Sequence, residues 1–366
     1  MEQRSKTEGR MKAWRLDGMG GALKLEDVPV PEVRAGSVLV RVEASSLMSY
    51  IKAYVDGDLP TYSTPGVPFT PGGNAVGVVE AVGRDVWSVK PGQRVVMSSL
   101  FVSSERVVDP TQVLIGVTAM DAGGTAMQAD WPNGTLAEFA LYPASAVTPV
   151  VGLDHIKSPQ LAVISRCTIP FGGLLRGRLA AGETLIVTGA SGAYGGATVL
   201  LALAMGAGRV IAAGRNVKAL EALKSAGGAR VKLVVLTGDV KADTEALRAA
   251  AGGGAEMAFD MVGRAQDPNA TLAALGALRR SGRLVLMGSM TAPLPISYMQ
   301  MMTNDLEIIG QFMYRGDANI RLLELLRTGC LDLSPIVPKV FTFADLPDAM
   351  NAAANAKSLE CVIVGP

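Results

Sequence analysis

The chain has 366 residues, with 34 Lys and Arg, 33 Asp and Glu, and a single histidine, His155. This length suits two domains, and balanced charge without a basic run excludes the electrostatic footprint of a nucleic-acid binder. Three widely spaced cysteines exclude a disulfide framework and are typical of a protein of the reducing cytoplasm.

Residues 1–10 are polar and predict a loose N-terminal extension. No later apolar run has the length of a membrane span, so we expect no membrane partner.

From about residue 11 to 150, short β-rich runs are broken by Gly and Pro, which predicts an all-β, barrel-like domain. One stretch interrupts them: "SLMSYIKAYVDG", residues 46–57, predicts a helix that ends at Gly57. The runs are "MKAWRL", "SVLVRVEAS", "AVGVVEAVG", "QRVVMSS" and "LAEFALYP".

From residue 184 the pattern changes to apolar strands that alternate with helices. "TLIVTG" precedes a helix at 194–206, "RVIAAG" one at 217–227, "KLVVLTG" one at 241–252 and "AEMAFDMVG" one at 268–282. Two more strands follow at 283–289 and 306–313. Apolar strands joined through helices indicate a doubly wound parallel sheet, and thus an α/β domain. The C-terminal tail has the pattern of a helix, a strand, a second helix and a second strand. It either extends this sheet or returns to the first domain.

The turn "TGASGAYGG", residues 188–196, joins a strongly apolar strand to a helix. A diphosphate bound to main-chain N–H groups at a helix N-terminus leaves no room for side chains, which explains glycines spaced three apart. We therefore predict dinucleotide binding by the turn residues Gly189, Ala190, Ser191, Gly192, Ala193, Tyr194 and Gly195.

The residue that selects between NAD and NADP is expected at the end of the next strand, about twenty residues further on. An acidic residue there would bind the ribose hydroxyls of NAD, but this chain has Arg215 and Asn216. An arginine forms charge-assisted bonds to a 2′-phosphate, so NADP(H) is the predicted cofactor. Ligands bind at the carboxyl ends of parallel strands, which adds Met261, Val262, Gly288 and Ser289 to the predicted cofactor site.

The order of several blocks resembles the medium-chain dehydrogenase/reductase superfamily, which contains zinc alcohol dehydrogenases and zinc-free quinone oxidoreductases. These blocks are "LKLEDVPVPEVRAGSVLVRVEAS", "TPGGNAVGVVEAVG", "VKPGQRVV", "GTLAEFALYPAS" and "LAAGETLIVTGASGAYGG". The resemblance implies a GroES-like catalytic domain over 11–154, a Rossmann domain over 155–314, and a C-terminal segment over 315–366 that returns to the catalytic domain. It also implies a small-molecule substrate, and a homodimer through the region of "PISYMQMMTND".

The resemblance fails at the expected zinc ligands. Met48 and Ser49 occupy the Cys-His positions, Gly73 and Asn74 the His-Glu positions, and only Cys167 matches a ligand. Catalytic zinc needs three protein ligands, so we expect no metal. Residues 97–133 match the region of a four-cysteine structural site but contain no cysteine. This segment could serve as packing, as a subunit contact or as a pocket wall.

Hydride transfer without a Lewis acid is easier when the acceptor is conjugated, because charge then spreads to an enolate oxygen. The main hypothesis is thus an NADPH-dependent reductase of a quinone or α,β-unsaturated carbonyl, with Tyr50 as proton donor and Ser49 and Asn74 orienting the substrate. Met48, Cys167 and Phe171 are predicted to line the substrate pocket. A metal-free alcohol or ketone oxidoreductase and a non-catalytic NADPH-binding sensor remain alternatives.

Overall fold

The computed structural model describes residues 9–263 and 265–365. The chain divides into two compact units. The first unit holds the described residues up to Ser165, Pro338–Asn355 and the residues from Cys361 onward, and the second holds Arg166–Val337 and Ala356–Glu360. This division has its first two boundaries after residues 165 and 337, and the predicted domain ranges 11–154, 155–314 and 315–366 stay a prediction.

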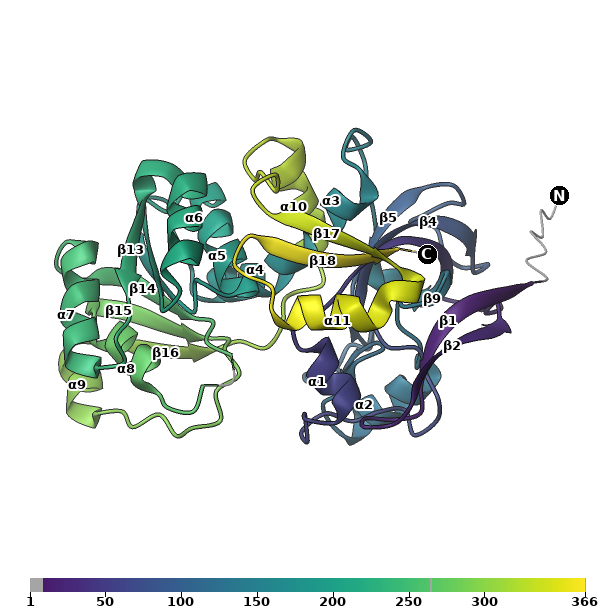
Figure 1. Cartoon of the computed structure of the whole chain (residues 1–366), viewed down its shortest axis with the longest axis horizontal. Helices are drawn as coiled ribbons and strands as arrows, with labels where there is room; N and C mark the ends of the chain where they lie inside the picture. Colours follow the sequence, from purple (N-terminus) through teal and green to yellow (C-terminus); the bar gives the residue numbers. More distant parts are fainter. Residues whose placement is uncertain (1–8, 264, 366) are drawn as a thin grey trace. The chain divides into compact units, whose positions relative to one another are not determined.

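The first unit is built mainly of antiparallel strands (Figure 1). Its largest sheet has the order β10-β5-β4-β3-β18-β17, with β9 also paired to β3, and a hairpin of β1 and β2 and a sheet of β6, β7 and β8 stand beside it. The strands are β1 Arg10–Leu16, β2 Leu23–Pro29, β3 Ser37–Ser46, β4 Asn74–Val82, β5 Arg94–Met97, β6 Leu100–Val102, β7 Gln112–Leu114, β8 Thr118–Ala119, β9 Phe139–Pro143, β10 Val147–Pro149, β17 Val337–Thr342 and β18 Glu360–Gly365.

Val38, Val40 and Val42 on one face of β3 share a core with Val79 of β4, while Leu39 on the other face of β3 packs into a second core. The helices of this unit are α1 Ile51–Asp56, α2 Ala122–Asp130, α3 Ser158–Ala162 and α11 Leu346–Ala354. Pairing of β18 with β3 shows that the C-terminal strand returns to the first unit, which decides between the two options for the tail.

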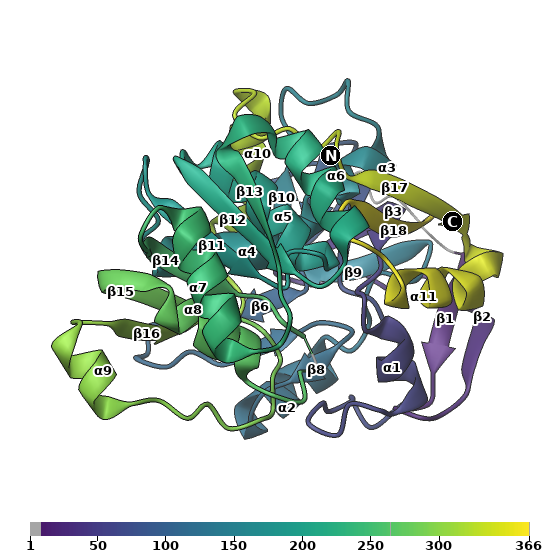
Figure 2. The ribbon, with the colours of Figure 1, turned by 60° about the vertical axis from the view of Figure 1, so that its left-hand side comes forward.

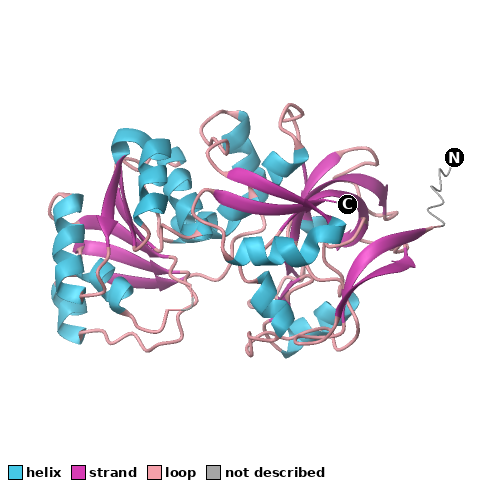
Figure 3. Ribbon diagram, in the orientation of Figure 1, coloured by secondary structure: helices cyan, strands magenta, loops and turns pink. Residues whose placement is uncertain are grey.

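The second unit is a six-stranded parallel sheet with the order β13-β12-β11-β14-β15-β16, the arrangement of a dinucleotide-binding fold (Figures 2 and 3). This confirms the predicted doubly wound sheet. Its strands are β11 Thr184–Thr188, β12 Arg209–Gly214, β13 Val231–Val235, β14 Ala255–Asp260, β15 Leu278–Leu286 and β16 Glu307–Gly310. Its helices are α4 Ser165–Arg176, α5 Ala193–Ala204, α6 Val217–Gly227, α7 Val240–Ala251, α8 Asn269–Gly276, α9 Tyr298–Thr303 and α10 Ala318–Arg327.

Helices cover this sheet closely. Leu247 of α7 and Ala273 of α8 share a core with Ile186 and Ala258 of the central strands, while α5 packs against β11 and β12. Glycines let α4 approach β14, since a Cβ on Gly173 would lie 2.6 Å from the Phe259 ring. Both sets of contacts explain why the strands are apolar without alternation.

Two predicted helices are shorter than expected. The helix predicted over 46–57 begins only at Ile51, because Ser46 still belongs to β3 and the Leu47 N–H donates to the Val362 carbonyl of β18. The helix predicted over 268–282 ends at Gly276, and Leu278 already starts β15. In both places pairing with a strand outweighs local helical propensity.

Candidate functional site: the cleft at the glycine-rich turn and the residues of the first unit

The glycine-rich turn lies between β11 and α5 in the second unit. Gly189 has φ 69°, and a Cβ at Gly195 would lie 2.1 Å from the Gly189 carbonyl oxygen. Both positions therefore require glycine for the backbone itself. Gly192, which is exposed at the N-cap of α5, has only that same carbonyl near its hypothetical Cβ, at 3.3 Å. The first N–H groups of α5 offer the chemistry of an anion-binding helix N-terminus.

A cleft opens beside this turn, at the carboxyl edge of the sheet. It brings together four predicted residues, Gly189, Ser191, Arg215 and Val262. The other lining residues are Gly214 at the end of β12, Asp243 of α7, Asn269 and Ala270 of α8, and the loop residues Leu236, Gly238, Gly263, Ala265, Gln266 and Asp267. Its position agrees with the rule that ligands bind outside the carboxyl ends of parallel strands.

The other predicted cofactor residues support the turn or lie near it. The Asn216 carboxamide oxygen accepts a hydrogen bond from the Ala219 N–H at 3.1 Å and so caps α6. Ala190 and Ala193 are buried, and the Tyr194 ring lies 5.2 Å from the guanidinium of Arg166.

The loops after β14 and β15 are hydrogen-bonded to each other. The Ser289 N–H donates to the Val262 carbonyl at 3.1 Å, and a Cβ on Gly288 would lie 2.4 Å from that oxygen. The Met261 backbone lies close to Gly189, because a Cβ on Gly189 would lie 2.8 Å from the Met261 carbonyl oxygen. All these predicted residues thus sit at one edge of the sheet.

Sequence reasoning missed Asp260, which joins β11 and α8 to the loop after β14. The buried Asp260 carboxylate ends β14 and accepts hydrogen bonds from the Thr188 hydroxyl at 2.8 Å, the Val262 N–H at 3.0 Å and the Thr271 hydroxyl at 2.8 Å. Buried carboxylates persist only with such partners. An Asp that ends an apolar strand was the available signal.

Four predicted site residues lie in the first unit, around the start of α1 and β4. Tyr50 precedes α1, and its ring contacts the Tyr62 ring edge-on at 5.9 Å between centroids. Met48 and Ser49 are half-buried. The Asn74 carboxamide oxygen accepts a hydrogen bond from the Ser99 N–H at 2.8 Å, so this oxygen already stabilises the neighbouring loop.

Tyr54, one turn after Tyr50, has a different environment. Its hydroxyl is buried and has no hydrogen-bond partner among the described residues, and burial raises the pKa of this phenol. The neutral form of Tyr54 is therefore strongly favoured.

The remaining predicted pocket residues, Cys167 and Phe171, lie in α4 of the second unit and are buried. The Arg321 guanidinium lies 5.0 Å from the Phe171 ring centroid. A substrate pocket shared by these residues and those of the first unit remains a prediction.

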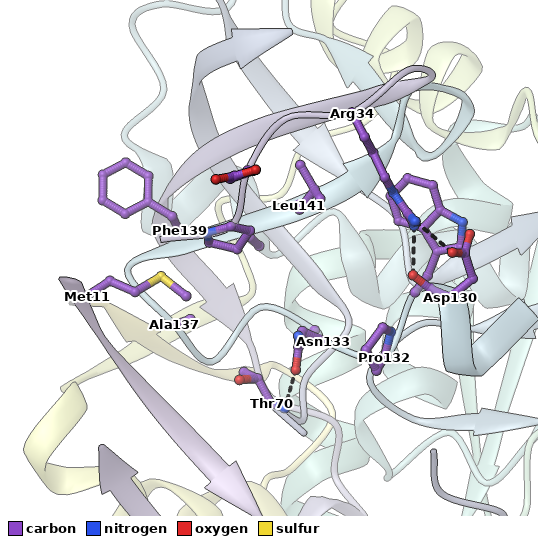
Figure 4. Close-up of a pocket in the computed structure, with 14 residues that line it drawn as sticks. Met11, Arg34, Thr70, Asp130, Pro132, Asn133, Ala137, Phe139 and Leu141 are labelled. Atoms are coloured by element: carbon purple, nitrogen blue, oxygen red, sulfur yellow. Dashed lines mark hydrogen bonds and ion pairs between the residues drawn. The ribbon is translucent and has the colours of Figure 1, made fainter. Parts of the chain in front are cut away.

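The cysteine-free segment 97–133 folds into β6, β7, β8 and α2. Val113, Ile115 and Ala119 are part of a core of the first unit, which supports the packing role for this segment. Its end forms one wall of a second pocket (Figure 4), where Arg34 pairs with Asp130 at 2.6 Å and lies 4.0 Å from the Trp131 ring centroid. Two further lining residues are hydrogen-bonded to each other, since the Thr70 N–H donates to the Asn133 carboxamide oxygen at 2.9 Å.

The described side chains do not provide a ligand set for zinc. Throughout the described part of the chain, no three His, Cys, Asp or Glu side chains are grouped so that they could hold a metal ion. A zinc site needs three or four such ligands, so the described residues do not fit this metal.

Two known families match the chain. The alcohol dehydrogenase GroES-like domain matches residues 34–152, and the zinc-binding dehydrogenase family matches residues 193–328. The chain belongs to the medium-chain dehydrogenase/reductase superfamily. The predicted combination of a GroES-like domain with a Rossmann sheet is confirmed.

This medium-chain dehydrogenase/reductase is similar to several curated dehydrogenases. It is 29% identical over 314 residues to an alcohol dehydrogenase of Moraxella sp. (strain TAE123), which covers 83% of this chain and 85% of the relative. It is 26% identical over 353 residues to L-threonine 3-dehydrogenase of Anaeromyxobacter dehalogenans (strain 2CP-C), which covers 92% and 93%.

Solved structures share its fold. An alcohol dehydrogenase of Escherichia coli CFT073 in complex with NADH superimposes with a TM-score of 0.81 at 20% identity, over 98% of this chain and 100% of that one. A dehydrogenase of Sinorhizobium meliloti 1021 bound to NADP gives 0.79 at 21% identity, over the same shares. Within residues 9–263 and 265–365, no helix has both the length and the apolar character needed to cross a bilayer.

Proposed function

We propose that this medium-chain oxidoreductase binds NADP(H) in the cleft of its second unit and interconverts an alcohol and a ketone without a metal ion. The cleft carries the proposal, because Arg215 and the glycine-rich turn before α5 meet at the carboxyl edge of a sheet with the dinucleotide-binding strand order. Structural neighbours that bind NADH or NADP support a nicotinamide cofactor.

The preference for NADP(H) rests on Arg215 alone. Arg215 follows the last residue of β12, where the adenosine ribose binds in this fold, and it is exposed for pairing with a 2′-phosphate. Asp243 and Asp267 line the same cleft, so its charge is mixed. NAD(H) is therefore the competing cofactor.

The substrate class follows the relatives. Their names, alcohol dehydrogenase and threonine dehydrogenase, favour an alcohol-type substrate over a quinone and so support what the sequence offered as an alternative. A conjugated carbonyl is the second candidate, since the described residues offer no ligand set for a Lewis acid and an enolate needs only a weak donor.

One of the matched families is described as zinc-binding. The proposed metal independence therefore rests on this chain's own residues and not on the family. We assign Tyr50 the transfer of a proton to or from the substrate oxygen, with Ser49 and the amide of Asn74 orienting the substrate. When bound, the nicotinamide would supply or accept the hydride.

The decisive experiment uses purified, tag-free protein. Oxidation of NADPH and reduction of NADP⁺ are followed by absorbance with panels of ketones, secondary alcohols, enals and quinones, and zinc is measured by elemental analysis. We expect turnover of ketones or alcohols, unaffected by chelators, with less than about 0.1 zinc per chain. Turnover confined to enals or quinones would favour the second candidate, and stoichiometric zinc would overturn the metal-free reaction. Binding of NADPH without turnover of any substrate would favour the sensor.

We also propose a homodimer formed through α9 and β16. The face of α9 exposes Tyr298, Met299 and Met302, and β16 pairs only with β15 among the described strands. An exposed sheet edge beside apolar side chains is typical of a surface that another chain covers.

A further inference from the structure

One buried carboxylate of the cleft has no part in the proposed reaction. Asp243 lies in the first turn of α7 and is 2% exposed, yet it lines the cleft with Arg215. Its Oδ1 accepts hydrogen bonds from the Thr237 N–H and hydroxyl, both at 2.9 Å, and its Oδ2 accepts one from the Gly238 N–H at 3.0 Å. Three donors compensate a charge that burial would otherwise make costly.

These bonds fix the turn that follows β13. Gly238 has φ 91°, and its carbonyl oxygen accepts a hydrogen bond from the Asn269 amide at 2.9 Å. Just before the turn, the Leu236 N–H donates to the Gly214 carbonyl at 2.9 Å. The turn is thereby tied to the end of β12 on one side and to the start of α8 on the other.

The same groups form the wall of the cleft next to the predicted adenosine subsite. Leu236, Gly238 and Asn269 all line it, and Gly214 directly precedes Arg215. In a dinucleotide-binding sheet the adenosine half lies over the carboxyl ends of the strands on this side. A displaced turn would therefore alter the subsite without touching the glycine-rich turn.

We propose that Asp243 is the positioning residue of the adenosine subsite. It holds the Thr237–Gly238 turn in the shape that accepts the adenosine half of the cofactor. This inference rests on the proposed binding of a nicotinamide dinucleotide and adds a residue that the glycine-rich turn and Arg215 do not predict.

Asp243→Asn tests it with little change in volume. The Asn side chain would turn an N–H₂ group toward at least one N–H or O–H group that now donates to the carboxylate. Two donors cannot bond to each other, so the turn must shift. We expect the Kd of both NADPH and the half-cofactor 2′,5′-ADP to rise at least about tenfold, measured by calorimetry. The KM for NADPH should rise in parallel, while kcat at saturating NADPH stays unchanged.

Arg248→Ala is the matched control, because Arg248 anchors the other end of α7. Its guanidinium donates to the Gly276 and Leu278 carbonyls, both at 3.1 Å, and it does not line the cleft. We expect this variant to lower the midpoint of thermal unfolding but to leave both Kd values within about twofold of the wild type.

The outcomes separate the two proposals. An Asp243→Asn protein that binds both probes like the wild type would overturn the positioning role, and so would an equal loss of affinity in Arg248→Ala. Wild-type protein that binds neither NADPH nor NADH would overturn the proposed function and this inference together.

Discussion

Arg215 shows how much a single residue can predict when its place in the fold is known. The end of the second strand of a dinucleotide-binding sheet faces the adenosine ribose, and β12 ends at Gly214, directly before Arg215. Tyr50 lacks such a rule. Tyr50 contacts Tyr62 through the conformation of a loop, and the helical pattern of residues 46–57 does not predict that conformation.

Replacing Arg215 by Ala should weaken NADPH far more than NADH. A charge-assisted hydrogen bond contributes about 1.5–3 kcal/mol, so we expect the Kd of NADPH to rise by about 10- to 100-fold and that of NADH by less than about threefold. Fluorescence titration of the bound nicotinamide measures both values. Equal losses for the two nucleotides would contradict the assignment of the 2′-phosphate to Arg215.

Tyr50→Phe should remove the proton transfer while it keeps the ring contact with Tyr62. General acid–base catalysis contributes about 10²- to 10⁴-fold, so we expect kcat to fall by that order with little change in cofactor affinity. Steady-state kinetics at saturating cofactor checks this.

Tyr54→Phe is the control on the same helix. It deletes a buried hydroxyl that has no partner among the described residues, so kcat should not change and the protein should be as stable or slightly more stable. An unchanged kcat in Tyr50→Phe would eliminate the donor role.

At the scale of elements, the strand–turn–helix unit β11–α5 follows from local sequence alone. Apolar strand, three spaced glycines and an apolar helix all favour the same structure, and the backbone geometry requires two of those glycines. The errors at 46–50 and 277–282 lie where residues of mixed propensity pair with strands distant in sequence or across a bulge.

Gly195→Ala should destabilise the protein and abolish cofactor binding. Its Cβ would lie 2.1 Å from the Gly189 carbonyl oxygen, and such overpacking costs about 1–3 kcal/mol or more. Gly192→Ala, whose backbone has φ −90° and ψ 165°, should change the free energy of unfolding by less than about 1 kcal/mol. Chemical denaturation compares the two, and equal stability would show that Gly195 is not required for packing.

At the scale of the whole molecule, the predicted surface for self-association can be tested without a cofactor. Met302→Glu combined with Tyr298→Glu places two charges on the exposed face of α9, and we expect it to convert a dimer into a monomer in sedimentation experiments. Trp87→Glu is the control, because Trp87 is the more exposed side chain, at 85% against 78% for Tyr298, and lies in the other unit. A dimer that survives the double substitution would place the contact elsewhere.

The sequence by itself determined the two kinds of domain, the strands of the parallel sheet, the glycine-rich turn and the position of Arg215, because each depends on periodicity or on spacing within a few dozen residues. Only the tertiary structure decided that β18 pairs with β3, that Asp260 joins β11, α8 and the loop after β14, and that Asp243 holds the wall of the cleft. These last features depend on hydrogen bonds between segments brought together by the sheet, and no local pattern specifies which donors a buried carboxylate will find.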